Sequence, residues 1–330
     1  MSEKIEILKG SSLWSDAWTR LKKNRMATAS LVFLAFILVS CFIIPIVGEV
    51  FAPEDDTVRA SDYWFKDPNN QDLNNTFASP SGANFLGTDH VGRDLFSRLL
   101  YGGQISLLVG LVATALSVVI GVIYGSIAGY AGKRFDIPMM RIVDILYGLP
   151  FLVLIILFSI LINEHLVELT TYLVDQKGFD ETSVKRLANL IPLFVAIGAL
   201  GWLTMARMAR AQVMSLKKQE FVEAAVSLGL SHRAILFRHI VPNMLGPIIV
   251  YMTLTVPGFI LTEATLSFLG LGVEAPNSSW GILLKEGANY METHSHLLLI
   301  PSITFSLTLF ALNFLGDGLR DALDPKASKD

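Results

Sequence analysis

The sequence predicts an all-α membrane protein with about six transmembrane helices. Of its 330 residues, 52% are hydrophobic and only 17% are charged, whereas an ordinary soluble domain carries about 25% charged residues. The apolar residues also fall into long runs. A helix needs roughly 18 or more such residues to cross about 30 Å of hydrocarbon. The low charge and the run lengths together exclude an ordinary soluble domain.

Six apolar runs are long enough to span a bilayer, and they cover residues 26–50, 105–130, 137–162, 190–208, 240–268 and 297–315. The first run follows a basic N-terminus, so a secretory signal peptide is its alternative interpretation. However, the run exceeds the 7–15 residues of a signal's apolar region, and no small-x-small cleavage site ends it. We therefore expect it to remain as the first span.

The Lys and Arg residues predict the orientation of the spans. Six spans place both termini and the segments 131–141 and 207–238 on one side, which then holds 18 of the 26 basic residues. Cytoplasmic loops carry the excess of Lys and Arg. We therefore expect both termini to be cytoplasmic. The opposite side then holds the segment 51–100, the polar insert 163–187 and the residues that follow the fifth run.

The spans have features of a packed bundle. Gly121, Gly125 and Gly129 recur every fourth residue in the second run, a spacing that lets membrane helices approach closely. The single cysteine, Cys41, lies in the first run and cannot form an internal disulfide or a thiolate cluster. Prolines that permit kinks are Pro150, Pro192, Pro247, Pro257 and Pro301.

No catalytic or cofactor motif is visible. The sequence lacks a GxxxxGK[ST] phosphate loop, a GxSxG elbow, an HExxH site and a CxxC pair. His294 and His296 are two residues apart and would point away from each other on a helix, so we expect no metal site. A membrane-embedded hydrolase would need a nucleophile or an acid–base set at membrane depth, and the sequence offers no convincing set. A channel or scaffold stays an alternative, although no filter motif or ring of charge is present. The net charge of −3 gives no reason to expect nucleic acid.

The longest cytoplasmic loop, 212–239, carries the most information. Residues 219–228 predict a short helix, which Gly229 is placed to end. Ser231 can then cap the next helix, which leads into the fifth span. From these residues alone, an ordinary amphipathic connector is as good an interpretation as a functional surface.

The spacing in this loop resembles a known signature. The string EAA (223–225) is followed by three residues, Gly229, nine residues and HIVP (239–242). This pattern is similar to the EAA motif of importer-type ABC transporter permeases. The segments 12–31, 85–110, 266–272, 278–281 and 313–326 resemble the oligopeptide, dipeptide and nickel permeases, most of all the C subunit of oligopeptide importers.

The resemblance implies a type I ABC importer permease in the bacterial cytoplasmic (inner) membrane, translocating oligopeptides. Nickel and other small cargo stay open, because related permeases share the signature. In such permeases the EAA helix docks on an ATPase subunit. Glu223 would make polar contacts, Ala224 and Ala225 would allow close approach, Gly229 would set the bend and Pro242 would start the fifth span. The implied partners are a second, B-type permease, two ABC ATPases that hold ATP and Mg, an extracytoplasmic peptide-binding protein and membrane lipid.

The resulting organisation has four parts: residues 1–50 with the first span, the extracytoplasmic segment 51–100, the five-helix core 101–318 with the loop 212–239, and the cytoplasmic tail 319–330. We expect residues 92–103 to form a short amphipathic helix that Thr88 or Asp89 caps and whose Leu95, Phe96 and Leu99 lie on the bilayer surface. Arg93 and Asp94 are candidates for an outer gate or a contact with the binding protein.

Two charged features lie in or near the spans. Glu263, in the fifth run, either lines the translocation path or sits near the outer end of its helix, where the cost of a charge falls. Arg141 and Asp144 are three residues apart at the start of the third run. On one helix face they are expected to form an interfacial pair.

Overall fold

The computed structural model describes residues 13–53, 64–179 and 181–323. Most of them are helical, and six stretches are long and apolar enough to cross a membrane. These are Arg25–Val50, Leu95–Ala131, Phe151–Asp175, Val184–Leu216, Leu245–Phe268 and His296–Leu323. The predicted all-α fold with six spans is confirmed. The N-terminal residues 1–12 and the end of the expected tail, 324–330, lie outside the described residues.

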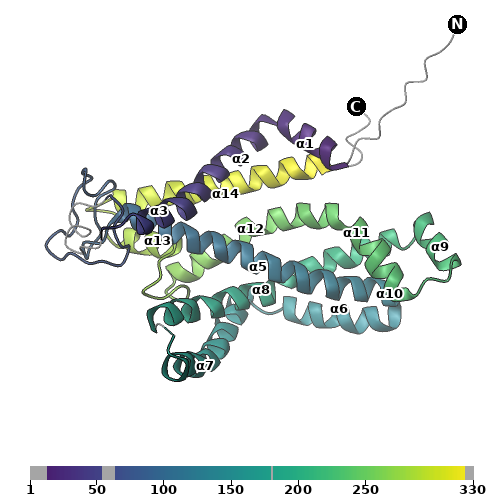
Figure 1. Ribbon diagram of the computed structural model, residues 1–330. Coiled ribbons are helices and arrows are strands. Elements are labelled where there is room, and N and C mark those ends of the chain that lie inside the picture. The colour runs from purple at the N-terminus through teal and green to yellow at the C-terminus, as the bar shows by residue number, and fades with distance from the viewer. Residues whose placement is uncertain (1–12, 54–63, 180, 324–330) are drawn as a thin grey trace, which may run out of the picture.

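The first span is assembled from several helical pieces. A short helix, α1 (Leu13–Lys23), precedes α2 (Arg25–Leu38), and Asn24 between them caps α2 by accepting hydrogen bonds from the backbone of Met26 and Ala27. A π-helical turn, η1 (Val39–Ile43), and α3 (Ile44–Val50) complete the span. α1 and α2 pack along α14 (His296–Leu323) on one flank of the bundle (Figure 1).

At the centre lies α5 (Leu95–Ala131), which packs along α8 (Glu181–Leu216). Three glycines of α5 permit this contact. A Cβ at Gly121 would meet Met205, one at Gly125 would meet the backbone of Ala206, and one at Gly129 would meet the backbone of Arg210. The predicted small-residue contact is therefore present, and α8 is its partner.

We expect Gly125→Leu to lower the free energy of unfolding by about 1–3 kcal/mol or more, because an overpacked core must displace backbone. Thermal unfolding in detergent measures this loss. Gly246→Leu is the matched control, because a Cβ at Gly246 meets nothing within 4 Å and leaving glycine favours a helix by about 1 kcal/mol. Equal stability of the two variants would contradict the packing role of Gly125.

The expectation of one continuous helix over 137–162 is wrong. α6 (Lys133–Tyr147) ends before Gly148, and α7 (Phe151–Lys177) begins after Pro150. A proline disfavours helical conformation in the residue before it, which accounts for the break at this point. The polar insert 163–187 belongs mostly to helices, because α7 continues to Lys177 and α8 starts at Glu181.

The pair expected between Arg141 and Asp144 is also replaced by a different one. Asp144 of α6 accepts a hydrogen bond from Arg207 of α8 at 2.8 Å. Asp136, two turns earlier on α6, pairs with Arg210 of α8. Two ion pairs therefore hold α6 against α8, where the pattern within one helix predicted a local contact.

After α8 come the short segments α9 (Glu220–Ser227), α10 (His232–Ala234), the π-helical η2 (Ile235–Ile240) and α11 (Val241–Asn243). The long span α12 (Leu245–Phe268) follows them, and then the shorter α13 (Trp280–Asn289). α9 and α10 lie at one end of the bundle, and α13 lies at the opposite end with the loop that precedes α5 (Figure 1). Two extramembranous surfaces are thus separated by the length of the spans.

The short surface helix expected over 92–103 is instead the first turns of α5. Leu95 and Leu99 are buried there, in a core cluster with Phe65 and Trp280, and not on the bilayer surface. The indole of Trp280 donates to the carbonyl of Leu99 at 3.0 Å. The N-cap is Asp94, which accepts from the backbone of Ser97, so the expectation of Thr88 or Asp89 is also wrong.

Candidate functional site

The predicted coupling loop forms a short helix with a well-defined end. α9 spans Glu220–Ser227, close to the predicted 219–228. Gly229 follows with φ +74°, its amide donates to Val226 O at 2.9 Å, and the amide of Leu230 donates to Ala225 O at 3.2 Å. These two bonds form a Schellman motif, which requires a left-handed residue at that position. The predicted helix-ending role of Gly229 is confirmed.

One face of α9 is fixed to the body of the protein. Val222 and Ala225 are buried in a core cluster with Ile235 and Met244, and this cluster also takes in Val213 of α8. After the bend, Ser231 caps α10 as predicted by accepting from the amide of Ala234. Packed side chains therefore join α9 to the adjacent end of α8 and to the helical segments that lead into α12.

The other face of α9 is exposed. Phe221, Ala224 and Leu228 lie at positions i, i+3 and i+7, and Leu228 is 80% exposed. Glu223 is exposed beside them. The two alanines of the EAA string thus point to different places, because Ala225 packs inward and only Ala224 faces out. Exposed apolar side chains that form a patch are typical of an interaction site.

Further contacts hold the loop against the end of α5. The Tyr130 hydroxyl lies 3.1 Å from His232 Nδ1, and Lys217 donates to the Tyr130 carbonyl at 2.8 Å. Pro242 lies in α11, which continues directly from the π-helical η2 and leads into α12. This position fits the expectation that Pro242 starts the approach to the fifth span, and its coupling role stays a prediction.

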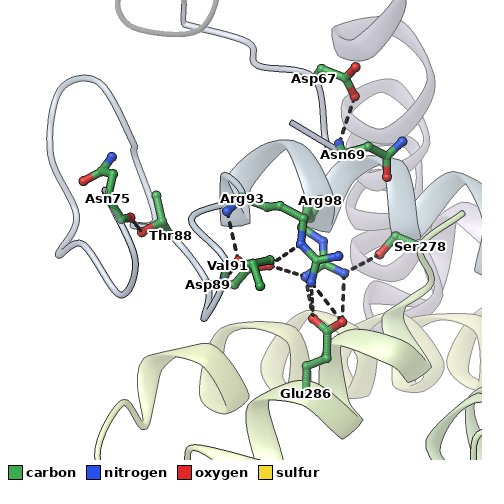
Figure 2. A network of polar contacts seen from close by, with 10 residues as sticks. All are labelled: Asp67, Asn69, Asn75, Thr88, Asp89, Val91, Arg93, Arg98, Ser278 and Glu286. Atoms are coloured by element: carbon green, nitrogen blue, oxygen red, sulfur yellow. Dashed lines mark hydrogen bonds and ion pairs between the residues drawn. The ribbon is translucent and has the colours of Figure 1, made fainter. Parts of the chain in front are cut away.

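At the opposite end, a charged network joins the loop before α5 to α13 (Figure 2). Arg98 contacts Asp89 at 2.6 Å and also pairs with Glu286. Arg93 contacts Asp89 at 2.7 Å and Glu286 at 3.0 Å. Arg98 is only 2% exposed, so the network fastens α13 to the start of α5 from within the protein.

Arg93 and Asp94, which the sequence analysis treated as one candidate site, have different roles in the structure. Arg93 belongs to it, whereas Asp94 is the buried N-cap of α5, and burial raises the pKa of the Asp94 carboxyl despite its hydrogen bond from Ser97. Thr88, the other expected cap, instead accepts from the amide of Ala78 and holds the loop together. A gate or binding-protein contact at Arg93 and Asp94 stays a prediction. Arg98 and Glu286 are the members that sequence reasoning missed.

The two arginines set the charge state of the network. Burial alone would raise the pKa of Asp89, but the guanidinium groups of Arg98 and Arg93 outweigh it and lower that pKa. For Glu286, burial is again outweighed by Arg98 and then Arg93, and its pKa is lowered. Both carboxylates therefore stay ionised at a lower pH than ordinary carboxyl groups do.

This charge state predicts a pH dependence. A carboxyl whose pKa is lowered by folding contributes stability above its unfolded pKa, at about pH 4, and loses it as the pH falls through the lower folded value. We therefore expect the unfolding midpoint of the wild type to drop below about pH 4 more steeply than that of Glu286→Gln. Thermal unfolding in detergent across a pH series measures the difference. Parallel profiles for the two proteins would rule out this contribution.

Glu263 lies deep in the bundle. It is 0% exposed, and its carboxylate accepts hydrogen bonds from Ser106 of α5 at 2.9 Å and from Ser267 at 2.7 Å. Ser106 accepts in turn from the amide of Trp280. Helices of this chain thus enclose Glu263, and two serine hydroxyl groups donate hydrogen bonds to it. Its role in the translocation path stays a prediction.

Comparison with known proteins decides the family. A family model for the "binding-protein-dependent transport system inner membrane component" matches residues 117–329. The chain belongs to this family. A second model, the "N-terminal TM domain of oligopeptide transport permease C", matches residues 12–80. The first model covers the EAA loop and the second covers the N-terminal segment 12–31, so both parts of the predicted resemblance are confirmed.

Relatives of this family of inner membrane components match nearly the whole chain. The oligopeptide transport system permease protein OppC of Haemophilus influenzae is 44% identical over 97% of this chain and 90% of that protein. OppC of Escherichia coli is 43% identical over 98% and 95%. The dipeptide transport system permease protein DppC of Bacillus subtilis is 40% identical over 96% and 86%. The family and the six apolar helices indicate a multi-pass inner membrane protein.

Proposed function

We propose that this chain is a permease subunit of an ATP-binding-cassette importer that translocates oligopeptides across a bacterial cytoplasmic membrane. The names of its relatives, which are oligopeptide and dipeptide permease proteins, support the cargo class. The observation that carries the coupling role is α9, whose inner face is packed into the protein and whose outer face presents Phe221, Ala224 and Leu228.

In this proposal α9 docks on a cytoplasmic ATPase. Val222 and Ala225 tie α9 to the spans, so that a movement of the ATPase reaches the bundle as a rigid-body shift. Ala224 allows the docking surface to approach closely, Glu223 adds polar contacts, and Gly229 keeps the bend that orients the helix.

The complete transporter contains further subunits. We assign ATP and Mg to two partner ABC ATPases, because the sequence holds no phosphate-binding loop of its own. A second, B-type permease completes the membrane part, and an extracytoplasmic peptide-binding protein delivers cargo. Both termini face the cytoplasm, which puts α9 on the ATPase side and places α13 with the charged network of Figure 2 on the outer side.

The outer network offers a second test of this arrangement. Arg93 is its more exposed arginine and is the one placed to meet a binding protein. We expect Arg93→Ala to weaken docking of the peptide-binding protein, measured by pull-down with the assembled transporter. Lys285→Ala on α13 is the control and is expected to leave docking unchanged. Undiminished docking and uptake in Arg93→Ala would remove this residue from the outer surface of the path.

Purification from the native membrane in mild detergent tests the proposed function as a whole. Recovery of a second, different permease together with phosphate-loop ATPases supports it. If the chain repeatedly emerges alone or as a homo-oligomer, in a detergent that keeps known importers intact, the coupling assignment loses its basis and a channel or scaffold replaces it.

A further inference from the structure

A cavity of about 440 Å³ lies where the break between α6 and α7 meets α8 and α12. Its volume falls within the roughly 300–1,000 Å³ of ligand pockets in proteins. The residues that matter for its chemistry are Tyr147, Thr204, Tyr251, Thr255, Gly258 and Thr262. Gly258 is close to the middle of α12, so the cavity lies at membrane depth, far from both α9 and the network at α13.

The broken helix shows that this face does not meet lipid. Gly148, Leu149 and Pro150 connect α6 to α7 without helical structure, and all three are exposed in this chain. Lipid tails cannot satisfy irregular backbone, which occurs at membrane depth only where protein covers it or where it lines a water-filled cavity. Leu149 itself lines the cavity.

An exposed charged pair beside the cavity favours water. Asp144 and Arg207 pair at 2.8 Å, with 58% and 41% of their side chains exposed. Arg207 also lies over the ring of Tyr147, 4.2 Å from its centroid. Charged residues within spans usually face a bundle interior or an aqueous path. Here the pair sits one turn of α6 from the break, at the edge of the same cavity.

The wall formed by α12 offers hydrogen-bond acceptors without charge. Tyr251, Thr255, Gly258 and Thr262 recur every three or four residues and form one stripe that lines the cavity. Thr255 donates to the Tyr251 carbonyl and Thr262 to the Gly258 carbonyl. Because each hydroxyl proton is used in this way, the oxygens offer lone pairs to a ligand. The space beside Gly258 is empty within 4 Å of a Cβ.

We propose that this cavity is a section of the translocation path and that it takes the uncharged backbone of an extended peptide. The hydroxyl oxygens of Thr255 and Thr262 accept hydrogen bonds from the peptide N–H groups, and the empty space at Gly258 leaves room for the chain to pass. None of the residues that line the cavity is ionisable apart from the two tyrosines, so the cavity does not select charged side chains. The inference rests on the proposed function and adds to it the residues that meet the cargo.

Thiol accessibility tests the environment of the cavity. Cys41 is the only cysteine, so Cys41→Ala gives a background for single-cysteine variants of the assembled transporter in lipid nanodiscs. We expect a charged, water-soluble methanethiosulfonate to modify Thr262→Cys at least about tenfold faster than Leu261→Cys. Leu261 is the control because it has the same depth but is not among the cavity's lining residues. Reaction of Thr262→Cys with only a lipophilic maleimide indicates lipid, and reaction with neither reagent indicates a covering protein. Either result overturns the proposal.

A substitution that fills the space tests the link to cargo. We expect Gly258→Phe to reduce uptake of labelled tetra-alanine into proteoliposomes at least about tenfold, while the ATPases still co-purify. Gly246→Phe on the same helix is expected to transport normally, since it too has open space around it and lies outside the cavity. Normal uptake by Gly258→Phe overturns this inference alone, whereas a wild-type preparation without ATPases or peptide uptake overturns the proposed function.

Discussion

Replacing Leu228 with Asp is expected to reduce ATP-driven uptake by at least about tenfold, equivalent to about 1.4 kcal/mol of docking energy. Leu228 is 80% exposed, so the substitution removes little packing within the chain. In a docked complex the new carboxylate would be buried against the ATPase without a partner, which is costly. Uptake into proteoliposomes and co-purification of the ATPases measure the effect.

Leu73→Asp is the matched control for this variant. Leu73 is a similarly exposed leucine, at 72%, in the loop that precedes α5. It lies at the end of the bundle opposite α9, so Leu73→Asp should retain its ATPases. Full uptake in Leu228→Asp, or the same loss of ATPases in both variants, would show that the exposed stripe of α9 is not a docking surface.

Removing the Arg98 guanidinium is expected to lower the free energy of unfolding by about 3–5 kcal/mol, the range found when one partner of a buried ion pair is lost. Arg98→Ala leaves Asp89 and Glu286 with Arg93 alone, and Asp89 is almost fully buried. Thermal unfolding of the purified protein in detergent measures the change. The expected order is a large loss for Arg98→Ala and a smaller one for Arg93→Ala, whose side chain is more exposed.

Arg134→Ala is the comparison for Arg98→Ala. Arg134 is an exposed arginine of α6, at the other end of the bundle, and surface substitutions usually change stability by no more than about 0.5 kcal/mol. If Arg98→Ala were as stable as Arg134→Ala, the network would not be what fastens α13 to α5.

The spans were predictable because the bilayer acts on composition along the chain. A helix of the required length must be apolar, whatever it later packs against. Five of the six runs fall on spans as expected, whereas the run 137–162 is divided between α6 and α7. The ends of the helices were less predictable. Thr88, Asp89 and Asp94 are all good caps by residue type, and the choice depends on tertiary contacts. Asp89 is taken by Arg98 and Arg93, which leaves Asp94 to cap α5.

The break near Pro150 shows a second limit. The sequence marks a proline there, but a proline within a span gives either a kink or a break, according to whether neighbours satisfy the freed backbone. Pro192, Pro257 and Pro301 lie inside continuous helices. Pro150 instead lies in the short break between the end of α6 and the start of α7. The local sequence cannot report the neighbours that make this difference.

The candidate sites also contain features that local sequence predicts and features that depend on the fold. The bend at Gly229 and the cap at Ser231 depend on residues a few positions away, and both were predicted. Phe221, Ala224 and Leu228 form the exposed stripe of α9, which was not predicted, because the spacing of residues on a helix does not show which face the rest of the fold covers. Glu286 lies 193 residues from Arg93, and no local pattern joins the two. Only the fold brings α13 against the start of α5.

Site-directed cross-linking tests most directly the central claim that α9 docks on an ATPase. On the Cys41→Ala background, Ala224→Cys places one thiol on the outer face of α9. A maleimide–benzophenone reagent attached to that thiol inserts on illumination into C–H bonds of a neighbouring subunit, so the partner needs no cysteine of its own. The predicted result is an adduct between this chain and a phosphate-loop ATPase, absent from Leu73→Cys. A transport-competent complex in which Ala224→Cys forms no such adduct, or in which Leu73→Cys forms it instead, would contradict the claim.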